Sequence, residues 1–205
     1  MNTIIQGDWH WPEGTTDKAI HTHLARMESM KHAVGMLPEG RRGMCVQAGG
    51  SHGMWPKWLA SQFKLVYTFE PEPNSFDALC QNVRNENVMK IQGALSYRTG
   101  TITLKRKGDS SHHIVAAIGD SLCFKLDNFI LPHVDAILLD VEGHEPEVLI
   151  GCRETIRRCH PMILIEYNAR SGGTGPKAEE VILSEPGYVY VCQVAADRIY
   201  KYKDG

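Results

Sequence analysis

The sequence lacks an excess of charge of either sign, a long apolar run and any paired spacing of cysteines. Its 205 residues carry 22 Lys and Arg against 24 Asp and Glu, for a formal net charge of −2. This balance gives no strong signal for a nucleic-acid partner, because such proteins present a basic face to the phosphates. A membrane span needs about 20 consecutive apolar residues, and no stretch of the sequence approaches that length. We therefore expect neither nucleic acid nor membrane among its partners.

Cysteine usage and the first residues bear on the cellular compartment. The six cysteines, at positions 45, 80, 123, 152, 159 and 192, are widely spaced and form no Cys-x-x-Cys motif. Several lie in apolar runs, where a free thiol packs as a small hydrophobic group. Residues 1–12 are polar, unlike the apolar segment of a secretory signal peptide. These features predict reduced thiols and a cytoplasmic protein.

Residues 1–40 differ in pattern from the rest of the chain. Apolar residues recur at helical spacing over residues 15–37, and a proline and a glycine end the pattern. Trp9 and Trp11 precede it. We expect a loop and then one amphipathic helix, forming a lid or cap on a main domain of residues 41–205. The two tryptophans either pack against that helix or its neighbours, or cover the active site.

Strand and helix patterns alternate from residue 43 onward. Strands are expected over 44–48, 65–69, 88–92, 100–105, 136–140 and 162–166. Helices are expected over 55–62, 75–85 and 146–156, and one or two strands, which could form a hairpin, over 187–203. Flexible loops at 108–113 and 168–176 are expected to shape a substrate pocket. The alternation predicts an α/β fold, with a mostly parallel sheet covered by helices on both faces.

Two carboxylates follow the most apolar of these strands. Asp140 and Glu142 stand two residues apart where the strand runs into a turn. Side chains at i and i+2 of a strand point to the same face, so the two are expected to lie together. Open α/β sheets bind their ligands at the carboxyl ends of the strands. The pattern therefore predicts a small-molecule site at this edge.

A glycine-rich loop follows the first strand of the main domain. Gly49, Gly50 and Gly53 lie between a strand and a helix, where the backbone can approach a ligand closely and offer it N–H groups. The next strand ends at Glu70, about twenty residues on, the distance at which an acid binds ribose hydroxyls in dinucleotide folds. This arrangement fits either NAD or S-adenosylmethionine.

Further segments in a fixed order separate these two cofactors. The glycine loop is followed by Phe69-Glu70-Pro71, Ala94-Leu95-Ser96, Leu126-Asp127-Asn128-Phe129, Asp140-Val141-Glu142-Gly143-His144-Glu145-Pro146-Glu147-Val148-Leu149-Ile150-Gly151 and Ile163-Leu164-Ile165-Glu166. The set resembles the FkbM family of S-adenosylmethionine-dependent methyltransferases. The similarity extends over about residues 43–168, and the segment that begins at Asp140 is its most specific part.

The resemblance implies a Rossmann-like class I methyltransferase fold with a seven-stranded sheet, and S-adenosylmethionine across the carboxyl ends of its central strands. It implies that the glycines line the methionine and ribose portion, Glu70 binds the ribose hydroxyls, and Ala94 and Leu95 contact the adenine. Asp140 would lie near the reacting methyl group. The residues so implied for cofactor binding are Gln47, Gly49, Gly50, Ser51, Gly53, Glu70, Pro71, Ala94, Leu95 and Asp140.

Gln47 departs from the family pattern, which usually has an acidic residue at this position. A glutamine can form hydrogen bonds, but it offers no charge to the amino group of the cofactor. One alternative is therefore a catalytically weak or inactive binding protein with a nucleotide-type fold. A second alternative, an NAD(P)-dependent oxidoreductase, is disfavoured because no second mononucleotide half follows Glu70.

Methyl transfer to a hydroxyl requires that the acceptor oxygen be held in line and lose its proton. The candidate catalytic residues are Asp140, Glu142, His144 and Glu166, with Asn168 nearby. His144 is the preferred base because it titrates near neutral pH, although it could equally be an exposed turn residue. The same carboxylates could hold Mg²⁺ or Ca²⁺, but the spacing does not require a metal, and none is expected.

The sequence thus predicts a methyltransferase that uses S-adenosylmethionine, acting on oxygen. The expected acceptor is a small molecule, a glycan or a similar hydroxylated compound.

Overall fold

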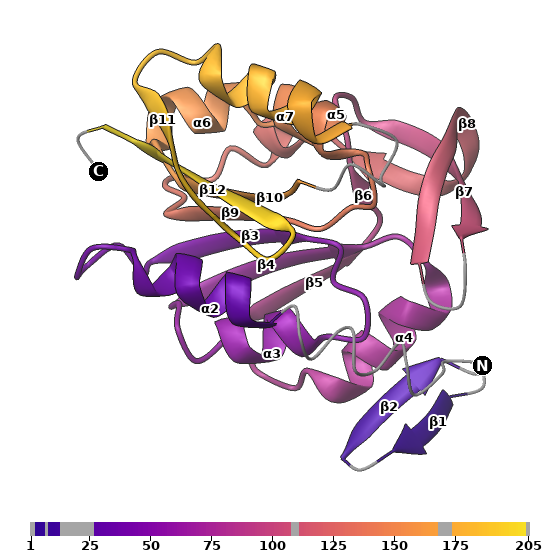
Figure 1. The fold of residues 1–205 in the computed structure, drawn as a ribbon. Coiled ribbons are helices and arrows are strands. Elements are labelled where there is room, and N and C mark those ends of the chain that lie inside the picture. The colour runs from indigo at the N-terminus through magenta and orange to yellow at the C-terminus, as the bar shows by residue number, and fades with distance from the viewer. Residues whose placement is uncertain (1–2, 7, 13–26, 108–110, 168–173, 204–205) are drawn as a thin grey trace.

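The computed structural model describes residues 3–6, 8–12, 27–107, 111–167 and 174–203. A seven-stranded sheet forms the centre of the molecule, with helices on both of its faces (Figure 1). From edge to edge its strands are β11 (Tyr188–Val194), β12 (Asp197–Tyr202), β10 (Met162–Glu166), β9 (Ala136–Leu139), β3 (Met44–Ala48), β4 (Leu65–Glu70) and β5 (Val88–Gln92).

The sheet is mostly parallel. Strand β12 runs antiparallel to its neighbours β10 and β11, whereas β10, β9, β3, β4 and β5 pair in parallel. The carboxyl ends of these five strands therefore meet at one edge. This arrangement confirms the predicted α/β fold of the class I methyltransferase type, and the strands expected over residues 187–203 are confirmed as the hairpin of β11 and β12.

Burial explains why the central strands are apolar at every position. All residues of β3, β9 and β10 are buried, because both faces of the sheet are covered. Alternate residues serve two cores: Ile137 and Leu139 belong to one, and Ala136 and Leu138 to the other. The first face carries α5 (Glu145–Gly151), α6 (Arg153–Cys159) and α7 (Thr174–Leu183), and the second carries α2 (Met27–Gly35), α3 (Met54–Leu59) and α4 (Pro73–Asn82).

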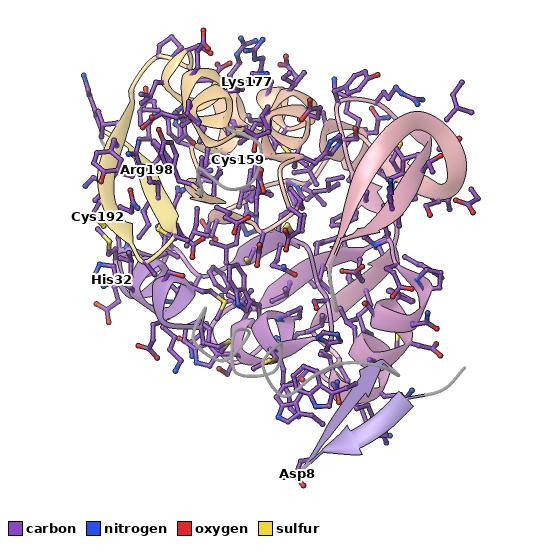
Figure 2. The ribbon with its side chains drawn as sticks, turned by 45° about the vertical axis from the view of Figure 1, so that its right-hand side comes forward. Asp8, His32, Cys159, Lys177, Cys192 and Arg198 are labelled. Carbon is purple, nitrogen blue, oxygen red and sulfur yellow. The ribbon has the colours of Figure 1, made fainter. Side chains whose placement is uncertain are left out.

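Contacts between distant segments close the edge of the second face. Helix α2 lies beside β11, where Nε2 of His32 is 3.9 Å from Sγ of Cys192 (Figure 2). Ser29 of the same helix donates a buried hydrogen bond to the carboxylate of Asp197, at the start of β12. Of the helices described, none has the length and apolar character that crossing a membrane requires.

Two smaller sheets extend from the central one. The first joins β6 (Ala94–Leu95), β8 (Ser111–Phe124) and β7 (Gly100–Lys107), and a short 3₁₀ helix (Leu126–Phe129) follows it. The second is an antiparallel hairpin of β1 (Thr3–Gln6) and β2 (Trp9–Pro12), which lies beside α4 (Figure 1).

Several local expectations were wrong. Trp9 and Trp11 lie in β2 and not in a loop, since aromatic residues suit a strand once a partner strand is present. Of the loop expected over 108–113, residues 111–113 belong instead to β8, which pairs antiparallel with β7, and residues 108–110 lie outside the described part. The start of the helix expected near residue 15 lies outside the described residues, and the described helix α2 ends close to the predicted end.

Two further boundaries differ. The helix expected over 146–156 is divided into α5 and α6 at Cys152, whose φ of −107° and ψ of 2° are not helical. Helix α7 begins at Thr174, inside the expected loop over 168–176, of which residues 168–173 lie outside the described part. No strong cap or apolar run announces α7 in the sequence, and its apolar positions become evident only against the sheet.

Helix α5 is held close to β6 at both of its ends. At its amino end, Nε2 of His144 is 3.0 Å from Oγ of Ser96. At its carboxyl end, a Cβ added to Gly151 would lie 2.0 Å from the carbonyl oxygen of Ser96. A glycine at this position therefore lets the helix approach the backbone of the neighbouring segment.

We predict that Gly151→Ala destabilises the protein by about 1–3 kcal/mol, because the added methyl group must displace Ser96 or the helix. Chemical denaturation measures this change. Gly35→Ala is the matched control: Gly35 ends helix α2 with nothing within 4 Å of an added Cβ, so this variant should be as stable as the original or slightly more so. Equal stability of the two variants would contradict the close approach at Gly151.

Candidate active site

The functional residues expected from the sequence gather at the carboxyl edge of the sheet. The glycine loop follows β3, Glu70 ends β4, and Asp140 follows β9. Parallel pairing of these strands brings the three segments together. Glu166 ends β10, and the register of Ile165 with Leu139 places Glu166 level with Asp140.

The glycine loop is pressed between the ends of two strands. The N–H groups of Gly49 and Gly50 donate to the carbonyl of Phe69, at 3.0 and 2.9 Å. On the other side, the N–H of Asp140 donates to the carbonyl of Ala48 at 3.1 Å. Gly49 has a φ of +85°, and a Cβ there would lie 1.9 Å from the carbonyl oxygen of Asp140. The loop therefore requires glycine at position 49 for both conformation and space.

Gln47 is fully buried beneath this loop, and its amide is used within the protein. Nε2 donates to the carbonyls of Ala48 and Gly49, at 3.1 and 2.9 Å. Oε1 accepts a hydrogen bond of 2.6 Å from the hydroxyl of Thr68. A carboxylate could accept from Thr68, but it could not donate to the two carbonyls. The residue that departs from the family pattern thus holds the loop in place.

Glu70 presents a buried carboxylate next to the loop. Its Oε2 accepts from the N–H of Ser51 at 2.7 Å, and its Oε1 from the N–H of Glu72 at 2.9 Å. Burial raises the pKa of Glu70 to about 7, although the two N–H groups act in the opposite direction. The N–H of Gly93, between β5 and β6, donates to the carbonyl of Glu70 at 3.1 Å, so β6 begins beside the end of β4.

The turn after β9 is closed by Glu145. This side chain is only 1% exposed, and its Oε1 accepts from the N–H groups of Val141 and Gly143, at 3.1 and 3.4 Å. Burial raises the pKa of Glu145 to about 7. Strand β9 ends at Leu139, and Glu142 has a φ of +54° in the turn. The i, i+2 spacing predicted that Asp140 and Glu142 share one face of a strand. This prediction was wrong, because both residues lie beyond the end of β9.

His144 lies between two protein groups. Its Nε2 contacts Oγ of Ser96 at 3.0 Å, and its Nδ1 is 3.6 Å from Oε2 of Glu147. Burial lowers the pKa of His144, while Glu147 acts in the opposite direction. His144 is therefore not an exposed turn residue, and both nitrogens of its imidazole face protein groups. It links the start of α5 to β6.

The remaining candidates differ in their surroundings. Leu95 is buried in the main core, Ala94 is buried in a small cluster with Ile102, and Pro71 is half-buried beside Glu70. Asn168 lies outside the described residues. Among the described side chains, no group of three or more His, Cys, Asp or Glu converges as a metal site would require.

Sequence reasoning missed three side chains that contact the glycine loop or the turn. Asn82, His52 and Ser96 are all buried, and each has a hydrogen bond to a residue far away in the sequence or to its neighbour in the loop. Asn82 closes a helix and Ser96 is one small residue in a motif, so neither stands out by residue type. Only His52 could have been found from the sequence, because it lies inside the glycine loop.

The strand order of the sheet and the loops at its carboxyl edge show that the chain has a class I methyltransferase fold. An O-methyltransferase from Bacillus cereus, solved with SAH, aligns with a TM-score of 0.55 at 14% identity, over 94% of this chain and 84% of that one. The methyltransferase FkbM from Methylobacillus flagellatus KT aligns with a TM-score of 0.61 at 18% identity, over 82% and 45%. At these identities the likeness establishes the fold alone.

The chain belongs to the FkbM methyltransferase domain family, whose profile matches residues 54–190. This confirms the predicted family. A curated relative, the hexuronic acid methyltransferase AglP of Haloferax volcanii, is 30% identical over 133 residues. The match covers 58% of this chain and 53% of the relative, so the chain spans about half the length of that protein.

We predict that Gln47→Glu, which restores the acid usual in the family, destabilises the protein by about 3 kcal/mol or more, because it buries a charge against two carbonyl oxygens. Thermal and urea denaturation measure the change. The control is Gln62→Glu, at a half-buried side chain whose Oε1 accepts a hydrogen bond from Arg42, and it should be close to neutral. A stable Gln47→Glu protein with higher affinity for S-adenosylhomocysteine would show instead that Gln47 marks a degenerate cofactor site.

Glu145 gives a prediction on pH. Its pKa is about 7 in the folded protein against 4.5 as the ordinary value, so the folded state binds more protons between these two pH values. Its contribution to stability is full below pH 4.5 and is lost as the pH rises through 7. In Glu145→Gln, urea denaturation between pH 5 and pH 7 should show a fall in stability that is smaller by up to about 1.4 kcal/mol per pH unit.

Glu70 and His144 contribute to the pH dependence of both proteins and largely cancel in this comparison. Glu154→Gln, at an exposed acid on α6, serves as the control and should leave the pH dependence as it was. Identical slopes in the original protein and in Glu145→Gln would mean that the Glu145 carboxyl ionises in the folded protein as it does in water.

Proposed function

We propose that this chain transfers a methyl group from S-adenosylmethionine to a hydroxyl oxygen of a small molecule or glycan. Membership of the family supports the reaction, and the curated relative is named for a hexuronic acid. A sugar acid, or a glycan that contains one, is therefore the first acceptor class to test.

The carboxylate of Glu70 is the observation that carries this proposal. A carboxylate has about four lone-pair sites, and two of them are used by the N–H groups of Ser51 and Glu72. The other sites suit two hydroxyl donors, such as the 2′- and 3′-hydroxyls of a ribose. The carboxylate is fixed before any ligand binds, because both of its backbone partners belong to the loops that frame it. The remaining acceptor sites of Glu70 therefore fit the ribose of an adenosine group.

Other residues of the edge would complete the cofactor site. Ser51 and the glycines would border the methionine and ribose portion, Pro71 would continue the wall beside Glu70, and Ala94 with Leu95 would border the adenine. Gln47 supports the loop from below and would act on the cofactor only through that loop.

When bound, S-adenosylmethionine supplies a methyl group on a positive sulfur, which transfers by in-line displacement. The task of the chain is to hold the acceptor oxygen behind the methyl group and to accept its proton. We assign to Asp140 the role of the base that accepts this proton, because it is half-buried at the strand end nearest the glycine loop. Glu166, level with Asp140 on β10, would orient the acceptor hydroxyl. Glu142 lies in the turn that follows β9. We assign His144 a positioning role, since Ser96 and Glu147 flank both of its ring nitrogens.

Calorimetric titration with S-adenosylmethionine, S-adenosylhomocysteine and NAD tests the cofactor. Micromolar binding of the first two without binding of NAD is expected. Release of S-adenosylhomocysteine is then measured with glucuronic acid glycosides against matched glucosides. Binding with no release on any acceptor would favour the alternative of an inactive binding protein, and no binding of either compound would reject the proposal.

Glu70→Gln should weaken binding of S-adenosylhomocysteine by roughly 10- to 100-fold, as expected for the loss of hydrogen bonds to a charged group. Glu72→Gln is the matched control. Glu72 lies two residues away, and its side chain caps α4 by accepting from the N–H of Ser75 at 2.6 Å. That variant should lose a little stability and keep its affinity. Equal affinities for both variants would remove Glu70 from the cofactor site.

A further inference from the structure

The carboxamide of Asn82 joins the amino-terminal hairpin to the glycine loop. Asn82 is the last residue of α4, and its side chain is buried with 6% exposed. Its Nδ2 donates to the carbonyl of His10 in β2 at 2.7 Å and to the carbonyl of His52 at 2.8 Å. Its Oδ1 accepts from the N–H of His10 at 2.8 Å. One side chain therefore holds three backbone groups from two segments about forty residues apart.

A ring contact reinforces this connection. Trp11 of β2 is 2% exposed, and its ring centroid is 4.8 Å from that of His52. On the same strand, the ring of Trp9 lies beneath the ammonium group of Lys57 on α3, at 4.5 Å. The hairpin is thus attached to the loop and to the helix that follows it. Asp8, in the turn of the hairpin, lies at the outer edge of the molecule (Figure 2).

The contacts continue from His52 to the predicted ribose site. Nδ1 of His52 is 3.0 Å from Oγ of Ser51, and the N–H of Ser51 donates to Glu70 at 2.7 Å. Ser51 has a φ of +46°, an unfavourable conformation for a residue with a side chain. Such a conformation persists only where the surroundings determine it. Asn82 and Trp11 supply those surroundings from the far side of His52.

We propose that the hairpin β1–β2 positions the glycine loop, with Asn82 and Trp11 as the connecting side chains, and that it thereby sets the affinity for the cofactor. Both are positioning residues, because they act through His52 and Ser51. The effect on affinity rests on the proposed function, whereas the effect on the loop itself does not. The hairpin and the glycine loop both precede residues 54–190, which match the family profile, whereas Asn82 lies within that match.

Two measurements on the chain of 205 residues test the inference. Hydrogen–deuterium exchange without ligand reports the loop directly, and Asn82→Ala should raise exchange of the amides at residues 49–53 at least about tenfold. Calorimetry should show S-adenosylhomocysteine binding weakened roughly tenfold at a temperature where the variant is folded. Asn82→Asp should behave like Asn82→Ala, since a carboxylate accepts from His10 but donates to neither carbonyl.

Asn87→Ala is the matched control. The Nδ2 of Asn87 also donates to two backbone carbonyls, those of Ala60 and Phe63 at 2.8 and 3.0 Å, but these lie at the end of α3 away from the loop. This variant should lose stability without a change in loop exchange or affinity. Trp11→Phe, which keeps a ring against His52, should retain affinity that Trp11→Ala loses.

The outcomes separate the inference from the proposed function. Loop exchange unchanged in Asn82→Ala, or changed equally in Asn87→Ala, overturns the positioning role. Faster loop exchange with unchanged affinity overturns the claim about the cofactor. If the original protein binds no S-adenosylhomocysteine, the proposed function fails, and the exchange comparison alone still decides whether the hairpin holds the loop.

Discussion

The contact between the backbones of Gly49 and Asp140 is the constraint on which this edge of the sheet depends. A Cβ on Gly49 would lie 1.9 Å from the carbonyl oxygen of Asp140, and the N–H of Asp140 donates to Ala48. Any side chain at position 49 would force the ends of β3 and β9 apart. The separation of the glycine loop from Asp140, and hence of the predicted cofactor site from the predicted base, is therefore set by backbone packing.

The buried charges around this contact explain why a neutral residue suits position 47. Glu70 and Glu145 are both buried carboxyls with a pKa of about 7, and Asp140 raises the pKa of each. An acid at position 47 would add another charge close to the same strand ends, where the low dielectric strengthens repulsion. The amide of Gln47 avoids that cost and donates to two carbonyls of the loop. Replacement of the acid is thus compatible with a formed site.

The sequence predicted what depends on pattern, and failed where contact between distant segments decides. The apolar runs at 44–48 and 162–166 became buried strands with the expected boundaries. Asp140 and Glu142 were expected on one strand face, but the carboxylate of Glu145 draws the backbone into a turn directly after Leu139. His144 contacts Ser96, 48 residues away, and His10 of the hairpin donates a hydrogen bond to Asn82, 72 residues away. Such pairs leave no periodic signal in the sequence.

The interactions that fix the site are directed mainly at backbone groups. Glu70 and Glu145 accept from backbone N–H groups, whereas Gln47 and Asn82 donate to backbone carbonyls. A carboxylate and an amide are therefore not interchangeable at these positions, because each has the donors or acceptors that its loop leaves unsatisfied. The chemistry of the loop thus selects acids at 70 and 145 and amides at 47 and 82. A motif defined by residue type alone treats Gln47 as a departure, but in terms of donors and acceptors it is the residue that this loop requires.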